Sequence, residues 1–170
     1  MTPEQEDLIL SLVTYPGRDP EGTPEQVLRH FNAKDGHTLG LDLLRDALHQ
    51  RGSVAVEMAL IVGFTFGITS DYLEELVELC SADWHHKHED VVSAIGKLHT
   101  SDAVDALYQA TQWVPGYLEF DDSRALATKA VWALGKTPGP EAQQALVRLL
   151  TSGDEIVRSA AMEQIARRKE

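Results

Sequence analysis

Ala94-Ile95-Gly96-Lys97 recurs 39 residues further along the chain as Ala133-Leu134-Gly135-Lys136. The recurrence reaches beyond these letters, because the segment 102–107 aligns with 141–146 at the same offset. A second offset, of 31 residues, places residues 60–76 on 91–107 and residues 126–134 on 157–165. Self-similarity at a fixed period of about 20–50 residues is the sequence signature of a repeat architecture. We infer a unit of about 31 residues, and the 39-residue spacing then contains an insertion of about eight.

The apolar residues follow a helical spacing along nearly the whole chain. Two helices are predicted to start at Thr2–Gln5 and Thr23–Gln26, where Thr-Pro-Glu-Gln offers an N-cap, a proline at the first helical position and a capping box. The other predicted helices cover about 39–51, 54–66, 71–81, 87–98, 102–112, 124–136, 141–151 and 154–168.

Short connections make neighbouring helices antiparallel, and stacking the resulting pairs buries the apolar face that one pair leaves open. Alanines at helical spacing allow the helices to approach closely: Ala94, Ala130, Ala133, Ala160 and Ala161. The sequence therefore predicts an all-α fold, an α-solenoid of stacked antiparallel helix pairs, in a single domain over residues 1–170.

The segment Asp154-Glu155-Ile156-Val157-Arg158-Ser159-Ala160-Ala161 resembles the HEAT-like repeat family, in particular the short bacterial class first described in phycobilisome lyases. That class has an acidic residue, then Val-Arg, then Ala at helical spacing. The resemblance covers residues 86–170 and extends in a weaker form to 54–85, so we expect HEAT-like repeats over 54–170 and degenerate N-terminal helices over 1–53. It implies a right-handed solenoid with a concave binding face, and it implies no particular activity.

The chain is acidic, with 15 Lys and Arg against 27 Asp and Glu and a formal net charge of -12. Such a surface repels phosphate backbones, which argues against nucleic acids and anionic membranes as partners. Two interpretations stay open for the excess of acids, namely faster encounter with a basic protein and plain solubility.

Two features bear on where the protein acts. The longest uncharged apolar stretch, residues 58–68, is too short for a bilayer, which requires about 20 residues. The only cysteine, Cys80, lies in an apolar stripe and has no partner for an internal disulfide, which indicates a buried thiol and a cytoplasmic location.

The insertion between the two repeated helix pairs is the first candidate site. Insertions in a solenoid gather on one rim, often the binding rim. Aromatic side chains flanked by charge are typical of interface hot spots. The candidate partner-binding residues are Trp113, Tyr117, Glu119, Phe120, Asp121 and Asp122. The alternative is packing, with Trp113 and Leu118 folded back to seal the gap between repeats.

A histidine cluster, formed by His85, His86 and His88 and followed by Glu89 and Asp90, is the second candidate. Imidazoles and carboxylates suggest a metal site, but their spacing matches a helical ligand set poorly, and acids are favourable at a helix start without a metal. We therefore favour structural or surface roles and expect no metal and no cofactor; a partner contact stays open.

Catalytic templates do not match: the chain has no Gly-rich phosphate loop and no Gly-x-Ser-x-Gly elbow. HEAT-like di-iron hydroxylases carry several His-Glu dipeptides on successive repeats, whereas this chain has one, His88-Glu89.

We expect a protein without enzymatic activity that binds another protein. Small acidic HEAT-like proteins resemble immunity and antitoxin proteins, which implies an inhibitor that occludes a basic partner such as a nuclease. The alternatives are a phycobilin-lyase-like or hydroxylase-like enzyme and a plain scaffold module.

Overall fold

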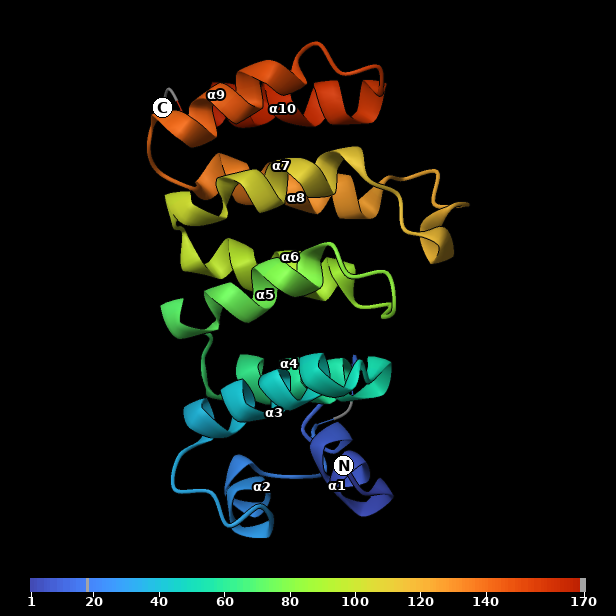
Figure 1. Ribbon diagram of the computed structural model, residues 1–170, viewed down its shortest axis with the longest axis vertical. Helices are drawn as coiled ribbons and strands as arrows, with labels where there is room; N and C mark the ends of the chain where they lie inside the picture. Colours follow the sequence, from blue (N-terminus) through green and yellow to red (C-terminus); the bar gives the residue numbers. More distant parts are fainter. Residues whose placement is uncertain (18, 169–170) are drawn as a thin grey trace. The chain divides into compact units, whose positions relative to one another are not determined.

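The computed structural model describes residues 1–17 and 19–168, which form ten α-helices and three short 3-10 helices (Figure 1). The α-helices are α1 (Pro3–Leu10), α2 (Pro24–His30), α3 (Gly36–Gln50), α4 (Ser53–Phe66), α5 (Leu73–Cys80), α6 (His88–Leu98), α7 (Val104–Gln112), α8 (Ala125–Lys136), α9 (Pro140–Leu149) and α10 (Glu155–Arg167). The 3-10 helices are η1 (Ser70–Tyr72), η2 (Ser101–Ala103) and η3 (Gly116–Leu118). Within the described ranges, we find no helix with the length and apolar character needed to cross a membrane. The predicted all-α fold, with its helices packed in pairs, is confirmed.

Both predicted capping boxes are present. The Thr23 hydroxyl accepts a hydrogen bond from the backbone N–H of Gln26 at 3.3 Å, and the Gln26 side chain accepts one from the N–H of Thr23 at 2.8 Å. Thr2 and Gln5 exchange the same two bonds at 3.3 and 2.9 Å. Each box satisfies two of the backbone donors that a helix start leaves without an intrahelical partner.

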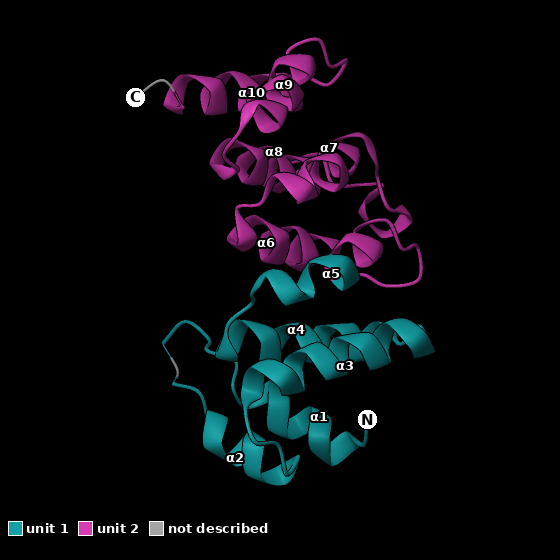
Figure 2. Cartoon of the chain, turned by 60° about the vertical axis from the view of Figure 1, so that its left-hand side comes forward, with its two compact units in different colours: residues 1–75 teal, residues 76–170 magenta. Residues whose placement is uncertain are grey.

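The contacts separate the chain into two compact units, unit 1 (Met1–Glu75) and unit 2 (Leu76–Glu170), with the boundary inside α5 (Figure 2). One continuous solenoid over residues 1–170 thus stays a prediction. The predicted division between degenerate helices and repeats, after residue 53, lies within unit 1.

In unit 1, α3 and α4 form a tight helical hairpin whose connection is Arg51, in a left-handed conformation at φ 50°, and Gly52. The predicted division after residue 53 therefore falls at the start of the second helix of this pair. Helix α1 packs against α4, and α2 packs against α1 and α3; the buried cluster at these contacts consists of Ile9, Val27, Met58 and Val62.

In unit 2, the helices α6, α8 and α10 follow one another on one side, here called the second-helix face. The helices α7 and α9, with residues 76–80 of α5, form the first-helix face, which is in front in Figure 1. Helix α8 packs against α6, α7, α9 and α10, so it is the centre of the unit. Its residues Ala130, Val131 and Leu134 are completely buried.

The repeated Ala-Ile/Leu-Gly-Lys segments mark where consecutive second helices touch. A Cβ added to Gly96 of α6 would lie 3.2 Å from the Cβ of Ala133 on α8. A Cβ on Gly135 of α8 would lie 2.8 Å from Cγ of Gln164 on α10. Since side chains rarely pack this tightly, the small residue at this position allows the close approach of each repeat to the next.

The end of α8 is closed by a residue from the end of α10. The Arg168 guanidinium donates hydrogen bonds to the carbonyl oxygens of Leu134 (3.0 Å), Gly135 (3.2 Å), Thr137 (2.6 Å) and Gly139 (3.1 Å). The last carbonyls of a helix have no intrahelical partner and carry its negative dipole end, so a guanidinium stabilises them. Arg168 thereby ties the last repeat to the one before it.

We predict that Leu134→Ala destabilises the protein by about 2–5 kcal/mol, because it leaves a cavity where α8 is enclosed by its neighbours. The free energy of unfolding, measured by urea denaturation, checks this value. Val147→Ala on α9 is the control, since Val147 is 49% exposed and its loss should change the stability by no more than about 0.5 kcal/mol. Similar losses in the two variants would contradict the central position of α8.

Candidate protein-binding site

The connection between α7 and α8 is the long one in unit 2. It covers residues 113–124, here called the insertion loop, whereas α5 and α6 are joined by residues 81–87 and α9 and α10 by 150–154. The loop protrudes to the right of the helix pairs and contains η3 (Figure 1). It is the insertion that the 39-residue offset predicted.

Two buried imidazoles support the base of this loop. His85 and His88 are fully buried, and their rings stack with centroids 4.1 Å apart. The Nε2 atom of His85 donates to the carbonyl oxygen of Leu79 at 2.8 Å, and its Nδ1 accepts from the N–H of Lys87 at 3.0 Å. With one nitrogen donating and the other accepting, His85 is a neutral imidazole, and burial lowers its pKa.

His88 connects the start of α6 to the insertion loop. Its Nε2 donates to the carbonyl oxygen of Ala82 at 2.7 Å, and its Nδ1 accepts from the Tyr117 hydroxyl at 3.1 Å. The Tyr117 oxygen in turn accepts from the backbone N–H of His88 at 3.3 Å. The His88 and Trp113 rings meet edge to face with their centroids 4.8 Å apart, so one imidazole contacts the start of the insertion loop and, through Tyr117, its η3 helix. The ring nitrogens of both buried histidines are thus engaged in the structural role that the sequence favoured.

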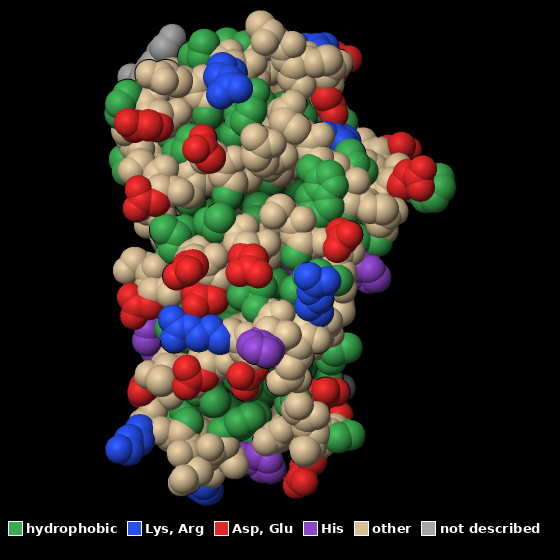
Figure 3. Space-filling view, in the orientation of Figure 1, with side chains coloured by type: hydrophobic (Ala, Val, Ile, Leu, Met, Phe, Trp, Pro, Cys, Tyr) green, Lys and Arg blue, Asp and Glu red, His purple; other side chains and the backbone are tan. Residues whose placement is uncertain are grey.

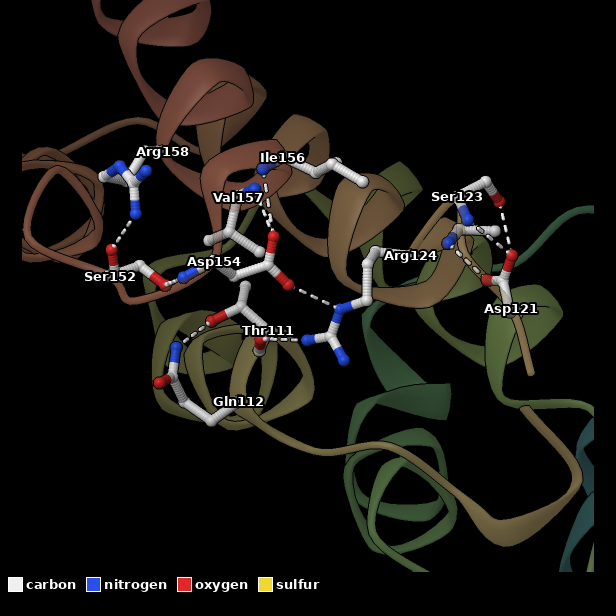
Figure 4. A network of polar contacts seen from close by, with 11 residues as sticks. Thr111, Gln112, Asp121, Ser123, Arg124, Ser152, Asp154, Ile156, Val157 and Arg158 are labelled. Atoms are coloured by element: carbon white, nitrogen blue, oxygen red, sulfur yellow. Dashed lines mark hydrogen bonds and ion pairs between the residues drawn. The ribbon is translucent and has the colours of Figure 1, made fainter. Parts of the chain in front are cut away.

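Asp121 is engaged at the start of α8. One carboxylate oxygen accepts from the N–H of Ala125 at 2.6 Å, and the other accepts from the backbone N–H of Ser123 at 3.1 Å and from its hydroxyl (Figure 4). These bonds lower the pKa of Asp121 and satisfy a donor at the helix start. The carboxylate is therefore part of a helix cap.

Arg124 joins this cap to the next repeat. Its guanidinium forms an ion pair with Asp154 at 2.8 Å and donates to the carbonyl oxygen of Thr111 at 3.3 Å (Figure 4). Asp154 is itself the N-cap of α10, accepting from the N–H groups of Ile156 (2.9 Å) and Val157 (3.3 Å). The end of α7 and the starts of α8 and α10 thus share one polar network, which fixes the end of the insertion loop.

The loop exposes a narrow set of side chains at its tip. Phe120 is 91% exposed, more than any other large apolar residue in the described part of the chain, and Glu119 and Asp122 beside it are exposed as well. Tyr117 is partly exposed, and burial together with the nearby acids of α6 raises its pKa. Of the six candidate residues, Glu119, Phe120 and Asp122 are exposed to solvent. Tyr117 is partly exposed and also hydrogen-bonded to His88. Trp113 packs on His88, and Asp121 caps α8.

A groove of about 580 Å³ lies next to the loop between α5 and α7. Its lining includes the apolar side chains of Val77, Ala110 and Trp113 and the carboxylate of Asp105. Cys80 also borders it, with a thiol whose burial raises the pKa to about 11. The predicted buried thiol is confirmed, and at neutral pH it is protonated and a poor nucleophile.

The family comparison agrees with this geometry. A family model described as HEAT repeats matches residues 73–166, more than half of the chain and the three pairs α5/α6, α7/α8 and α9/α10. The chain belongs to the HEAT repeat family. HEAT repeats typically mediate protein–protein interactions. No curated protein and no solved structure gives a match to the chain.

Sequence reasoning missed Arg124 and Arg168. Both bind groups about 30 residues away, and their local sequence gives no sign of these partners. For Arg124, the 31-residue offset gave a partial indication of a helix start, because it places Ser123 at the position that the N-cap residue Asp154 has one unit later. Asp121, two residues earlier, supplies the capping carboxylate instead.

We predict that the pKa of His88 is about 4, because burial disfavours the imidazolium. An unfolded histidine has a pKa near 6.5, so below that pH the unfolded chain binds a proton that the folded chain does not. The stability from neutral His88 is therefore complete above about pH 6.5 and is lost as the pH falls toward 4. Nitrogen NMR of the ring at about pH 5.5 should show a neutral Nε2–H tautomer.

Denaturation at several pH values provides the second readout. His88→Gln should flatten the fall in stability between about pH 6.5 and 4, because glutamine carries no group that titrates in this range. A His88 ring that is protonated at pH 5.5 would refute this account of the loop base.

Proposed function

We propose that the chain is a non-enzymatic HEAT repeat protein that binds another protein, of basic character, through the tip of the insertion loop and the groove between α5 and α7. The observation that carries the proposal is the 91% exposure of Phe120 on a loop whose two ends are fixed. Exposing a large aromatic ring to water is unfavourable, and a partner that buries the ring removes its apolar surface from water, which favours binding.

The anchoring of the loop favours tight binding. A contact residue on a mobile loop loses conformational entropy when it binds, which reduces the affinity. Here Tyr117 is held by His88 and the start of α8 is capped by Asp121, so much of that ordering is already present. An aromatic anchor surrounded by polar side chains is the usual composition of an interface hot spot.

The charge around the site favours a basic partner. Glu119 and Asp122 flank Phe120, and Asp105 borders the adjacent groove. Figure 3 shows the first-helix face of unit 2, where acidic side chains are more frequent than basic ones and the protruding loop carries apolar and acidic groups at its tip. Complementary charge speeds encounter and orients the partner, and its effect weakens with salt.

The finer proposal is an inhibitor of the immunity or antitoxin type, acting in the cytoplasm. Occlusion would be the mechanism: the carboxylates of the loop occupy the place of a substrate's phosphates, and Phe120 fills an apolar cavity beside them. The net charge of -12 and the acidic tip support a basic partner such as a nuclease. This function requires no metal or cofactor in the chain.

We predict that a photo-crosslinking phenylalanine analogue at position 120 captures one defined protein from cells of the source organism. The same analogue at Met162 of α10, also exposed, is the matched control and should not capture it. The captured protein, once purified, should bind the wild-type chain at least about tenfold more tightly than a Glu119→Lys/Asp122→Lys variant at low salt, and this difference should shrink with added salt. Equal capture from both positions, or salt-insensitive binding to a partner without basic character, would contradict the proposal.

A further inference from the structure

A second groove, of about 550 Å³, lies on the second-helix face of unit 2 between α6 and α8. Its floor is formed by small and apolar residues, among them Val92, Gly96 and Ala133. The lining also includes two hydroxyl side chains, four bases and an aromatic ring: Ser93, Thr128, Lys97, His99, Lys129, Lys136 and Trp132. No residue of the insertion loop lines it, so this groove is distinct from the site proposed above.

Three bases of this face recur at equivalent positions of consecutive repeats. Lys97 and Lys136 are related by the 39-residue offset, and Lys136 and Arg167 by the 31-residue offset. Each lies in the last turn of its helix, α6, α8 and α10 respectively. The negative end of a helix dipole favours a base there, which explains each residue singly. The dipole does not explain why the three bases share one face with an aromatic ring.

Trp132 lies within this row of bases. The Arg167 guanidinium carbon is 4.6 Å from the centroid of the indole ring, within the range of a cation–π contact, and Arg167 also forms an exposed ion pair with Glu163 of α10 at 2.6 Å. Across the groove, Lys129 of α8 forms an ion pair with Glu89 of α6 at 2.9 Å. Trp132 is partly exposed, while Lys97, Lys129 and Lys136 are exposed. The groove therefore offers an apolar surface bordered by cations in a chain that is otherwise strongly acidic.

We propose that this groove binds an extended acidic segment of a partner protein. Packed helices lie about 8–10 Å apart, so the repeats present a cation at about that spacing. An extended chain in the polyproline II conformation has three residues per turn and rises about 3.1 Å per residue, so carboxylates at every third position lie on one side at about this spacing. The carboxylates pair with Lys136 and, in exchange for contacts within the chain, with Lys97 and Arg167, and an apolar side chain between them packs beside the Trp132 ring.

Charge complementarity selects this occupant. A long polyanion such as a nucleic acid would also approach the acidic surface of the rest of the chain, whose net charge is -12. A short acidic segment contacts the groove alone. Each exposed ion pair contributes little by itself, about 0.2–1 kcal/mol, so affinity depends on several pairs formed in register.

The test uses two fluorescein-labelled peptides of identical composition and the full-length protein. The first peptide has glutamate at every third position and one central leucine, and the second has its glutamates adjacent to one another. Fluorescence anisotropy at low salt should show saturable binding of the first peptide and at least about threefold weaker binding of the second. Binding should weaken steeply as salt is added.

Matched charge reversals locate the site. Lys136→Glu should weaken binding of the first peptide about tenfold. Arg148→Glu is the control, since Arg148 also lies in the last turn of a helix, but on α9 of the first-helix face; it should change the affinity less than about twofold. Thermal denaturation should show that both variants are folded.

Three outcomes would overturn the proposal. The first is no saturable binding of the spaced peptide, and the second is an equal loss in Lys136→Glu and Arg148→Glu, which would indicate a general effect of net charge. The third is a single-stranded oligonucleotide that binds more tightly than the peptide and displaces it. Because the Lys136→Glu variant leaves the insertion loop intact, its capture of a partner through position 120 reports on the proposed function separately.

Discussion

The close packing of consecutive second helices is the constraint on which unit 2 depends. Helix α8 is enclosed by four neighbours, and Gly96 and Ala133 bring it near α6 because neither has a side chain that would hold the backbones apart. A single helix pair would leave this apolar side in water, so the repeats stabilise one another. Polar contacts between repeats, such as those of Arg168 and Arg124, then fix their register at the two ends of α8.

The insertion loop shows how a stacked scaffold can hold an irregular segment in place. Its base uses buried neutral imidazoles as hydrogen-bonding groups, and its end uses a carboxylate as a helix cap. Because the Tyr117 hydroxyl and the Asp121 carboxylate form hydrogen bonds within the chain, the side chains at the tip are the part of the loop most available to a partner. The same scaffold separates charge, with an acidic tip beside the first-helix face and a row of bases on the second-helix face.

Periodicity predicted most of the fold, because it depends on local spacing. The capping boxes at Thr2 and Thr23, the helix pairs and the place of the insertion follow from residues close together in sequence or one repeat apart. The candidate site was predicted less completely. Sequence singled out the loop, but whether a carboxylate such as that of Asp121 caps a helix or faces solvent depends on backbone geometry that composition does not encode. The contacts of Arg168 lie about 30 residues away, beyond the reach of local patterns.

Native-state hydrogen exchange of unit 2 reports whether α8 is stabilised by the repeats on both of its sides. We expect the amides of α8 to exchange most slowly and only through unfolding of the whole unit. Those of α10, which packs mainly against α8 and α9, should open at a lower free energy. Amides in α8 that exchange as fast as those in α10, or faster, would show that the repeats on its two sides do not stabilise α8.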